Sequence, residues 1–174
     1  AQFTRFSQWL SAACATSTHT LFVVSPVPVL HWVDKLVNYA DLGGAKDDFQ
    51  DEWDHETNQA ERAALLNTAF ANLDAKGKTL VFLSGDVHCA SVFKLTHKKF
   101  RAAKIFQVTS SAISRKPAPK VSLIGITPGG VMDGCKDVRS ERLFALTGNK
   151  NFAMIKVQQL DNAYDEVTVD LCWP

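Results

Sequence analysis

An aspartate and a histidine, Asp86 and His88, stand one residue apart in the stretch "SGDVHCA", which follows the apolar run at residues 80–83. Carboxylate oxygens and imidazole nitrogens are both ligands for divalent and trivalent metal ions. In a turn after a strand, the side chains at positions i and i+2 can point to one place. The pair therefore suits half of a metal site. The alternative is structural, with the aspartate capping a turn and the histidine hydrogen-bonded to a neighbour.

An acidic segment, "KDDFQDEWDHET", is a second place where a cation could bind. The EF-hand pattern fails there because no glycine takes the sixth loop position, so we expect a solvated loop. Trp53 in this segment could line a substrate pocket or anchor the loop on the core, and we favour the anchor. His55 could approach the Asp86–His88 turn. Arg62 could reach a phosphate or pair with an acidic neighbour, and we expect a salt bridge on a helix face.

Several other catalytic patterns do not occur in the sequence. Ser110 and Ser111 lack the G-x-S-x-G surroundings of a nucleophilic serine. Neither a Walker A motif nor G-x-G-x-x-G is found. No C-x-x-C pair occurs, so we expect free buried thiols rather than a zinc site at the four cysteines, Cys14, Cys89, Cys135 and Cys172.

The elements that would position these residues alternate between helix and strand in the first half of the chain. Apolar spacing predicts helices at residues 4–14, 30–40 and 58–75, and short β-branched runs predict buried strands at 19–25 and 79–84. Asn58 with Glu61 resembles a capping box, and Gly77 suits the end of the last helix.

After Gly77 the apolar period changes to that of strands. The candidates are residues 79–84, 90–96, 104–111, 142–148, 152–160 and 166–173. Residues 114–141 are rich in Pro and Gly and are expected to form an irregular surface loop, which is often functional. We predict an α/β fold in which strand 79–84 is central and ends at the Asp86–His88 turn. Helix 58–75 should pack on one face of its sheet, and the later strands should form a second sheet.

The composition favours a single domain. The chain has 174 residues, 46% of them apolar, which is ample material for one core. The formal net charge is +1, so no overall field attracts nucleic acid, membrane surfaces or acidic partners. No apolar run is long enough to span a bilayer. We expect residues 1–174 to form one domain, with no nucleic-acid or membrane partner indicated.

An ordered set of segments resembles the alkaline phosphatase D (PhoD-like) group of calcineurin-type metallophosphoesterases. The helix "FSQWLSAAC" is similar to the family's Q-x-x-W-L segment with shortened spacing, and "LFVVSPVPVL" to the strand and loop that follow. The segment "DEWDHETNQAERAALL" resembles its D-x-W…E-R-x-x-L-L pattern, and "LVFLSGDVHCA" its late motif. The later strands are similar at "VTSSAIS" and "NFAMIKV". The resemblance runs from about residue 5 to residue 170.

This resemblance implies a metal-dependent hydrolase of phosphate monoesters or diesters that uses two metal ions, from among Fe, Mn, Zn and Ca. The late motif of the wider superfamily is G-H-x-H, and PhoD-like members have Asp in the first ligand place. By this analogy Asp86 and His88 are metal ligands. Such metals generate a nucleophile from water and neutralise charge on the phosphoryl oxygens. No residue is assigned as a catalytic acid or base.

Candidate substrate contacts follow from position in the same segments. Ser25 stands where many superfamily members carry a further histidine ligand. Trp53, His55 and Arg62 are the other residues that we consider for contact with the substrate.

The superfamily's earlier motifs, D-x-H, G-D-x-x-[DY] and G-N-H-[DE], do not occur. We therefore expect the chain to be the C-terminal half of a four-layer α/β-β/α metallophosphoesterase sandwich, with mixed sheets flanked by helices. Its partner would be the N-terminal half of the same enzyme, in cis or as a separate chain. The isolated chain should have little or no phosphatase activity. The alternative is a non-catalytic interaction or structural domain that keeps the phosphatase-like fold.

Overall fold

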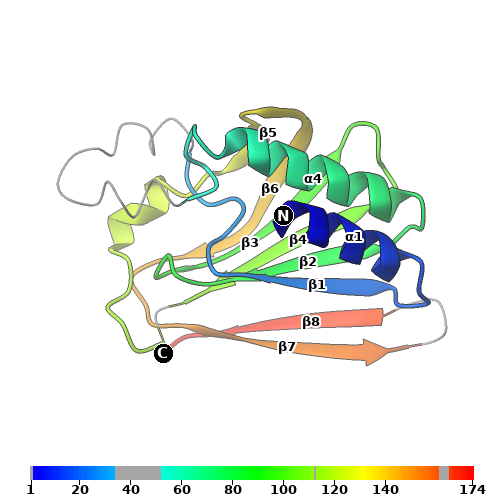
Figure 1. Ribbon diagram of the computed structural model, residues 1–174. Coiled ribbons are helices and arrows are strands. Elements are labelled where there is room, and N and C mark those ends of the chain that lie inside the picture. Colours follow the sequence, from blue (N-terminus) through cyan, green and yellow to red (C-terminus); the bar gives the residue numbers. More distant parts are fainter. Residues whose placement is uncertain (1, 34–51, 112, 161–164) are drawn as a thin grey trace.

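The computed structural model describes residues 2–33, 52–111, 113–160 and 165–174 (Figure 1). The helices and strands of these residues, in chain order, are α1 (Gln2–Cys14), β1 (Thr20–Ser25), α4 (Gln59–Asp74), β2 (Thr79–Ser84), β3 (Ala90–His97), β4 (Lys104–Ser110), the 3₁₀ helix η1 (Lys120–Ile124), β5 (Gly129–Met132), β6 (Cys135–Leu146), β7 (Phe152–Gln159) and β8 (Asp165–Cys172).

A mixed six-stranded sheet carries the fold, with the strand order β1-β2-β4-β3-β6-β5. β1, β2 and β4 run parallel, and the remaining neighbours pair antiparallel. β2 lies between β1 and β4, so Leu80 pairs with Leu21 on one side and Ile105 on the other. A strand with a neighbour at each edge and apolar layers on both faces needs a nearly continuous apolar sequence, which "TLVFLS" provides. The predicted α/β class and the interior position of residues 79–84 are confirmed.

Helices α1 and α4 lie side by side on one face of this sheet (Figure 1). The apolar stripe of α4 is fully buried, at Leu66, Ala69, Phe70 and Leu73. It packs in one core cluster with alternate residues of the strands, such as Leu80 of β2. Each fully buried large side chain of this kind contributes about 1.5–3 kcal/mol. The predicted packing of this helix on one face of the sheet is confirmed.

The sequence predicted the C-terminal end of α4 correctly but not its N-terminal cap. The capping box is wrong: Asn58 makes no side-chain hydrogen bond that caps the helix, and its Nδ2 donates instead to the Glu52 carbonyl at 2.9 Å. The C-terminal glycine is confirmed. Gly77 has φ +61°, and the Lys78 N–H donates to the Leu73 carbonyl at 3.1 Å, which closes the last turn.

β7 and β8 pair antiparallel as a separate two-stranded sheet on the face opposite the helices (Figure 1). The prediction of a second sheet is therefore confirmed for β7 and β8 only, since β3, β4 and β6 join the first sheet. Strand patterns show which residues share a face but not which strands become neighbours.

Two further sequence predictions are wrong. Residues 30–33 are not helical, because Trp32 bridges to Ile126 and the Val33 N–H donates to the Gly125 carbonyl at 2.9 Å. Residues 34–40, the rest of that predicted helix, lie outside the described residues. Residues 114–141 were expected to form an irregular loop, but they include β5 and the first half of β6. These two strands join through Asp133 and Gly134, and Gly134 has φ +71°.

The four cysteines are free thiols. Cys14, Cys89 and Cys135 are buried, as expected, and Cys172 is half-buried. Within the described ranges, no helix is long and apolar enough to cross a membrane.

Candidate functional site

Asp86 and His88 lie in the turn that leaves the end of β2. The Gly85 N–H donates to the Pro26 carbonyl at 3.3 Å, and the Ala118 N–H donates to the His88 carbonyl at 2.7 Å. Both residues of the pair have a left-handed backbone, with φ +66° for Asp86 and +54° for His88. A non-glycine residue in this conformation costs roughly 1–2 kcal/mol. Two such residues persist only where the surrounding contacts impose them, and such strain concentrates at functional sites.

The side chains of this pair face outward from the core. Asp86 is exposed and His88 is half-buried. Across the parts of the chain that the structure describes, neither side chain forms a hydrogen bond. The structural alternative, in which the aspartate caps the turn and the histidine bonds to a neighbour, needs such bonds and is not supported.

The pair forms a wall shared by two cavities. The first has a volume of about 680 Å³ and is called the β7 cavity, because Ala153 and Ile155 of β7 face Leu83 and Val108 of the first sheet across it. Its remaining lining residues are mostly polar and lie at the ends of β2 and β4, in the segment that follows β4 and beside β7: Ser84, Asp86, His88, Ser110, Ser111, Ile113, Ser114, Arg115, Asn151 and Phe152.

The second cavity, called the Trp32 cavity, has a volume of about 570 Å³. Besides Asp86 and His88, it is lined by one indole, one carboxylate and a proline-rich segment: Trp32, Glu52, Val87, Lys116, Pro117, Ala118 and Pro119. Arg115 lines the β7 cavity and Lys116 lines the Trp32 cavity, so the lining of each cavity includes one cationic side chain.

The donors of the shared wall fit a metal ion by type but are too few to complete a site. Within the residues that the structure describes, no three His, Cys, Asp or Glu side chains gather closely enough to hold a metal ion. A carboxylate and an imidazole that face a cavity match the ligand chemistry of Zn, Mn and Fe. A two-metal site needs several more ligands than this pair provides.

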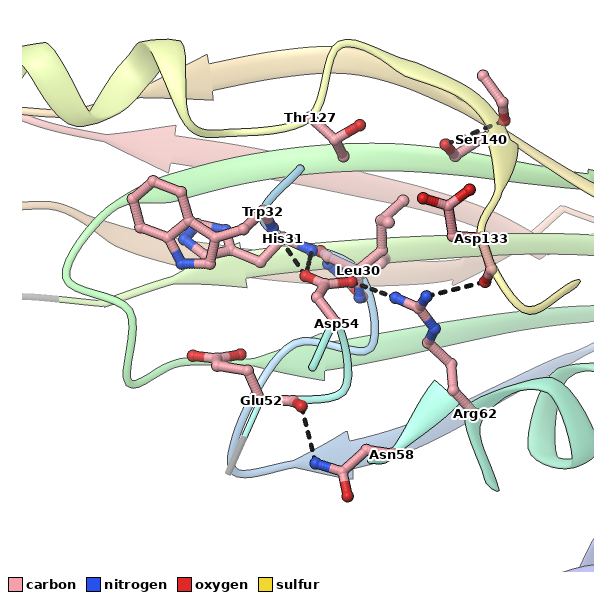
Figure 2. A network of polar contacts seen from close by, with 12 residues as sticks. Leu30, His31, Trp32, Glu52, Asp54, Asn58, Arg62, Thr127, Asp133 and Ser140 are labelled. Carbon is pink, nitrogen blue, oxygen red and sulfur yellow. Dashed lines mark hydrogen bonds and ion pairs between the residues drawn. The ribbon is translucent and has the colours of Figure 1, made fainter. Parts of the chain in front are cut away.

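Beside the Trp32 cavity lies a buried polar network centred on Asp54 (Figure 2). Its Oδ2 accepts hydrogen bonds from the backbone N–H groups of His31 and Trp32, both at 2.7 Å. Its Oδ1 accepts from Arg62, whose second guanidinium nitrogen donates to the Asp133 carbonyl at 3.1 Å. Asp54 and Arg62 are both 0% exposed.

This network corrects two expectations. The acidic segment is not solvated at Glu52 and Asp54, which are buried because the segment folds against residues 30–33 and α4. Its residues 46–51 lie outside the described residues. Arg62 does pair with an acidic residue, but inside the protein rather than on a helix face. Because its guanidinium is fully buried on Asp54, it presents no surface to a ligand.

The other sequence candidates lie apart from the shared wall. Ser25 and Trp53 line a separate cavity of about 360 Å³ near α1, and the Ser25 hydroxyl donates to the Val27 carbonyl at 2.6 Å. Trp53 also packs against the core cluster, as expected of an anchor. His55 Nδ1 lies 2.7 Å from the Thr57 hydroxyl and lines neither cavity of the shared wall. The structure therefore brings Asp86 and His88 together and leaves the remaining candidates elsewhere.

Sequence reasoning missed the residues that surround the pair. Trp32 was assigned to a helix and Glu52 to a solvated loop, because their long-range partners are not visible locally. Arg115 and Lys116 carried a weak signal, since two adjacent cations stand in a segment predicted to be a functional loop.

His31 and Cys89 lie behind the shared wall, with 3.9 Å between His31 Nε2 and the Cys89 sulfur. Burial lowers the pKa of His31 to about 3, and burial together with the charge of Glu52 raises the pKa of the Cys89 thiol to about 12. Both groups are therefore neutral near pH 7. A catalytic thiol needs a thiolate and access to solvent, so this pair is a packing contact rather than a second reactive centre.

A family model described as PhoD related phosphatase matches residues 33–126, which is more than half of the chain. A solved structure described as "Structure of PhoD" matches with a TM-score of 0.43 and 14% identity, over 94% of this chain and 31% of that one. The chain thus spans about a third of the length of that protein. No curated protein matches.

Proposed function

The chain belongs to the family of PhoD related phosphatases, and from this we propose that it contributes part of a two-metal site that hydrolyses phosphate monoesters or diesters. The observation that carries the proposal is the shared wall. Asp86 and His88 lie at the end of an interior strand, in a strained turn, with metal-binding donor atoms that face two cavities.

The residues of the shared wall and the two cations beside it would have different tasks. Asp86 and His88 would hold metal, with Fe, Mn, Zn or Ca as the candidate ions. A bound metal ion lowers the pKa of water and neutralises charge on phosphoryl oxygens. Arg115 and Lys116 would attract the phosphate group from either side, because a cation near the reacting centre stabilises the negative charge that the group carries.

The remaining metal ligands must come from residues other than those that the structure describes. We propose that they are supplied by the N-terminal half of the same enzyme, in cis or as a separate chain. In that arrangement residues 1–174 form the C-terminal part of a larger domain, and the six-stranded sheet is half of a four-layer α/β-β/α sandwich. The donor count among the described residues supports this proposal, because the two ligands of the shared wall, divided between two metals, would leave both ions weakly held.

The test measures metal binding and turnover together. The 174-residue chain, and an enzyme that joins it to a segment with the missing motifs, are assayed with nitrophenyl phosphate and bis(nitrophenyl) phosphate in the presence of Mn, Zn, Fe or Ca. We expect weak metal binding and little turnover for the chain alone. In the joined enzyme, Asp86→Ala and His88→Ala should each lower kcat/KM by two orders of magnitude or more, with little change in Tm.

Asp137→Ala is the matched control. This carboxylate is largely exposed, pairs only loosely with Lys98 at 3.4 Å, and lies away from both cavities. Its removal should leave turnover unchanged. Metal-dependent turnover by the 174-residue chain that is lost in Asp86→Ala would refute the need for a second half but retain the activity. A joined enzyme that binds no metal would favour the alternative, a non-catalytic interaction or structural domain.

A further inference from the structure

Among the described residues that line the two cavities of the shared wall, two have large aromatic side chains: Trp32 in the Trp32 cavity and Phe152 in the β7 cavity. Trp32 is half-buried and lines the Trp32 cavity, where Asp86 and His88 form the adjoining wall, and its ring also meets the His31 ring edge to face with 4.8 Å between the ring centroids. The same cavity holds Pro117, Pro119 and Lys116. A substrate phosphate placed at the shared wall would therefore have an indole within reach of its organic group.

The position of Trp32 is fixed by contacts on several sides. Asp54 accepts a hydrogen bond from its backbone N–H at 2.7 Å, and Arg62 holds Asp54 in turn (Figure 2). A β-bridge joins Trp32 to Ile126. The ring lies so close to Gly125 that an added Cβ there would be 2.0 Å from its Cζ3 atom. Trp32 is thus placed before any ligand arrives.

A ring held in this way suits stacking on another flat group. Tryptophan offers a large rigid surface at low entropic cost, and a preorganised contact loses little freedom on binding. The proline rings of residues 117 and 119 add a stiff apolar surface to the same cavity. The Ala118 N–H donates a hydrogen bond to the His88 carbonyl at 2.7 Å, which fixes the position of this segment relative to Asp86 and His88.

We infer that Trp32 is a specificity-determining residue: it stacks on a planar ring in the organic group of the phosphate ester, while the phosphate lies beside Asp86, His88 and Lys116. The inference rests on the proposed function for the placement of the phosphate. It assigns a substrate class, namely phosphate esters whose organic group carries a flat aromatic ring. Asp54 and Arg62 are positioning residues for this contact.

The test measures binding rather than turnover, with two phosphonates that a phosphatase does not cleave. One is 4-nitrobenzylphosphonate, and the other is cyclohexylmethylphosphonate, which has the same charge and similar bulk but no flat ring. Dissociation constants for the 174-residue chain are obtained from ligand-observed NMR titrations without added metal. We expect the aromatic ligand to bind about three- to tenfold more tightly, the range that aromatic pairing adds beyond burial.

Trp32→Leu should abolish this preference and leave the affinity for the cyclohexyl ligand within about twofold. Trp9→Leu is the control, because Trp9 is an exposed tryptophan on α1 that lines neither cavity. It should keep the preference. Gly125→Ala should weaken the preference, since its methyl group would displace the indole, and circular dichroism checks that each variant is folded.

Equal affinities for the two ligands in the unmodified chain, or no binding of either, would overturn the inference. A preference that survives in Trp32→Leu would overturn it as well. A preference that depends on Trp32 in a protein that hydrolyses no phosphate ester would uphold the inference and count against the proposed function. Hydrolysis of a phosphate ester by a protein that shows no preference for the aromatic ligand would overturn the inference and support the proposed function.

Discussion

Arg62→Met removes a buried cation while keeping an apolar stem of similar length. Asp54 then retains the backbone N–H donors of His31 and Trp32 at 2.7 Å but loses the positive charge of Arg62 at a site that is 0% exposed. Breaking a buried ion pair by removing one partner costs about 3–5 kcal/mol. The Asp133 carbonyl also loses a donor, which adds about 1 kcal/mol. We expect the free energy of unfolding to fall by about 4–6 kcal/mol.

A double-mutant cycle separates this electrostatic cost from lost packing. Asp54→Asn keeps a carbonyl oxygen for the two backbone donors but removes the carboxylate charge that faces the buried Arg62 cation, so it should also cost about 3–5 kcal/mol. The double variant, Asp54→Asn with Arg62→Met, contains neither charge. Its cost should be smaller than the sum of the single costs by at least about 2 kcal/mol.

Urea unfolding followed by far-ultraviolet circular dichroism measures these free energies. Small domains are stable by about 5–15 kcal/mol, so a single variant can be partly unfolded without denaturant. In that case the double variant should regain structure that the single variant lacks. Costs that add to within about 0.5 kcal/mol would refute the argument, because they would mean that the two charges do not stabilise each other.

Two further predictions concern the pH and the backbone. Because burial lowers the pKa of His31 to about 3, the unfolded chain binds a proton below about pH 6.5 that the folded chain does not. Stability should therefore fall as the pH decreases, by about 2 kcal/mol from pH 7 to pH 5 for this group. Urea titrations at both pH values should show a smaller fall in His31→Gln, and an equal fall would contradict the assignment. Gly129→Ala should cost about 3 kcal/mol, because Gly129 has φ +102° and an added Cβ would lie 2.6 Å from the Ser140 carbonyl oxygen. Gly130→Ala, with φ +134° but open space around the added Cβ, should cost only about 1 kcal/mol, and equal losses of Tm would show that the close contact does not matter.

The sequence predicted the elements whose pattern is strong and local. The apolar stripe of α4 and the run of β2 are recognisable because burial on one face, or on both, imposes a period on the residues themselves. Most later strands were recognised in the same way. The sheet to which each strand belongs was not recognised, since the apolar patterns of β3, β4 and β6 would allow each of them to pair with several partners.

The sequence identified some residues of the candidate site and not others, depending on whether their role can be seen from neighbouring residues. Asp86 and His88 could be named from two chemical side chains beside a buried run, and from the resemblance of their motif. Glu52 and Trp32 could not, because nothing near them in the sequence indicates that they face the same cavity as that pair. The four candidate substrate contacts, Ser25, Trp53, His55 and Arg62, line neither cavity of the shared wall, because their positions depend on contacts with distant parts of the chain.

The sequence by itself determined α1, α4, the interior strand and the presence of an aspartate and a histidine directly after that strand, because these depend on the properties of neighbouring residues. The tertiary structure alone decided that residues 30–33 are not helical. Their helical spacing is overridden because Asp54, Gly125 and Ile126 satisfy the backbone groups that a helix would have used. It also decided that Arg62 is buried, since its charge is tolerated only where Asp54 meets it. Such partners come from distant parts of the chain, and only the folded backbone brings them within bonding distance.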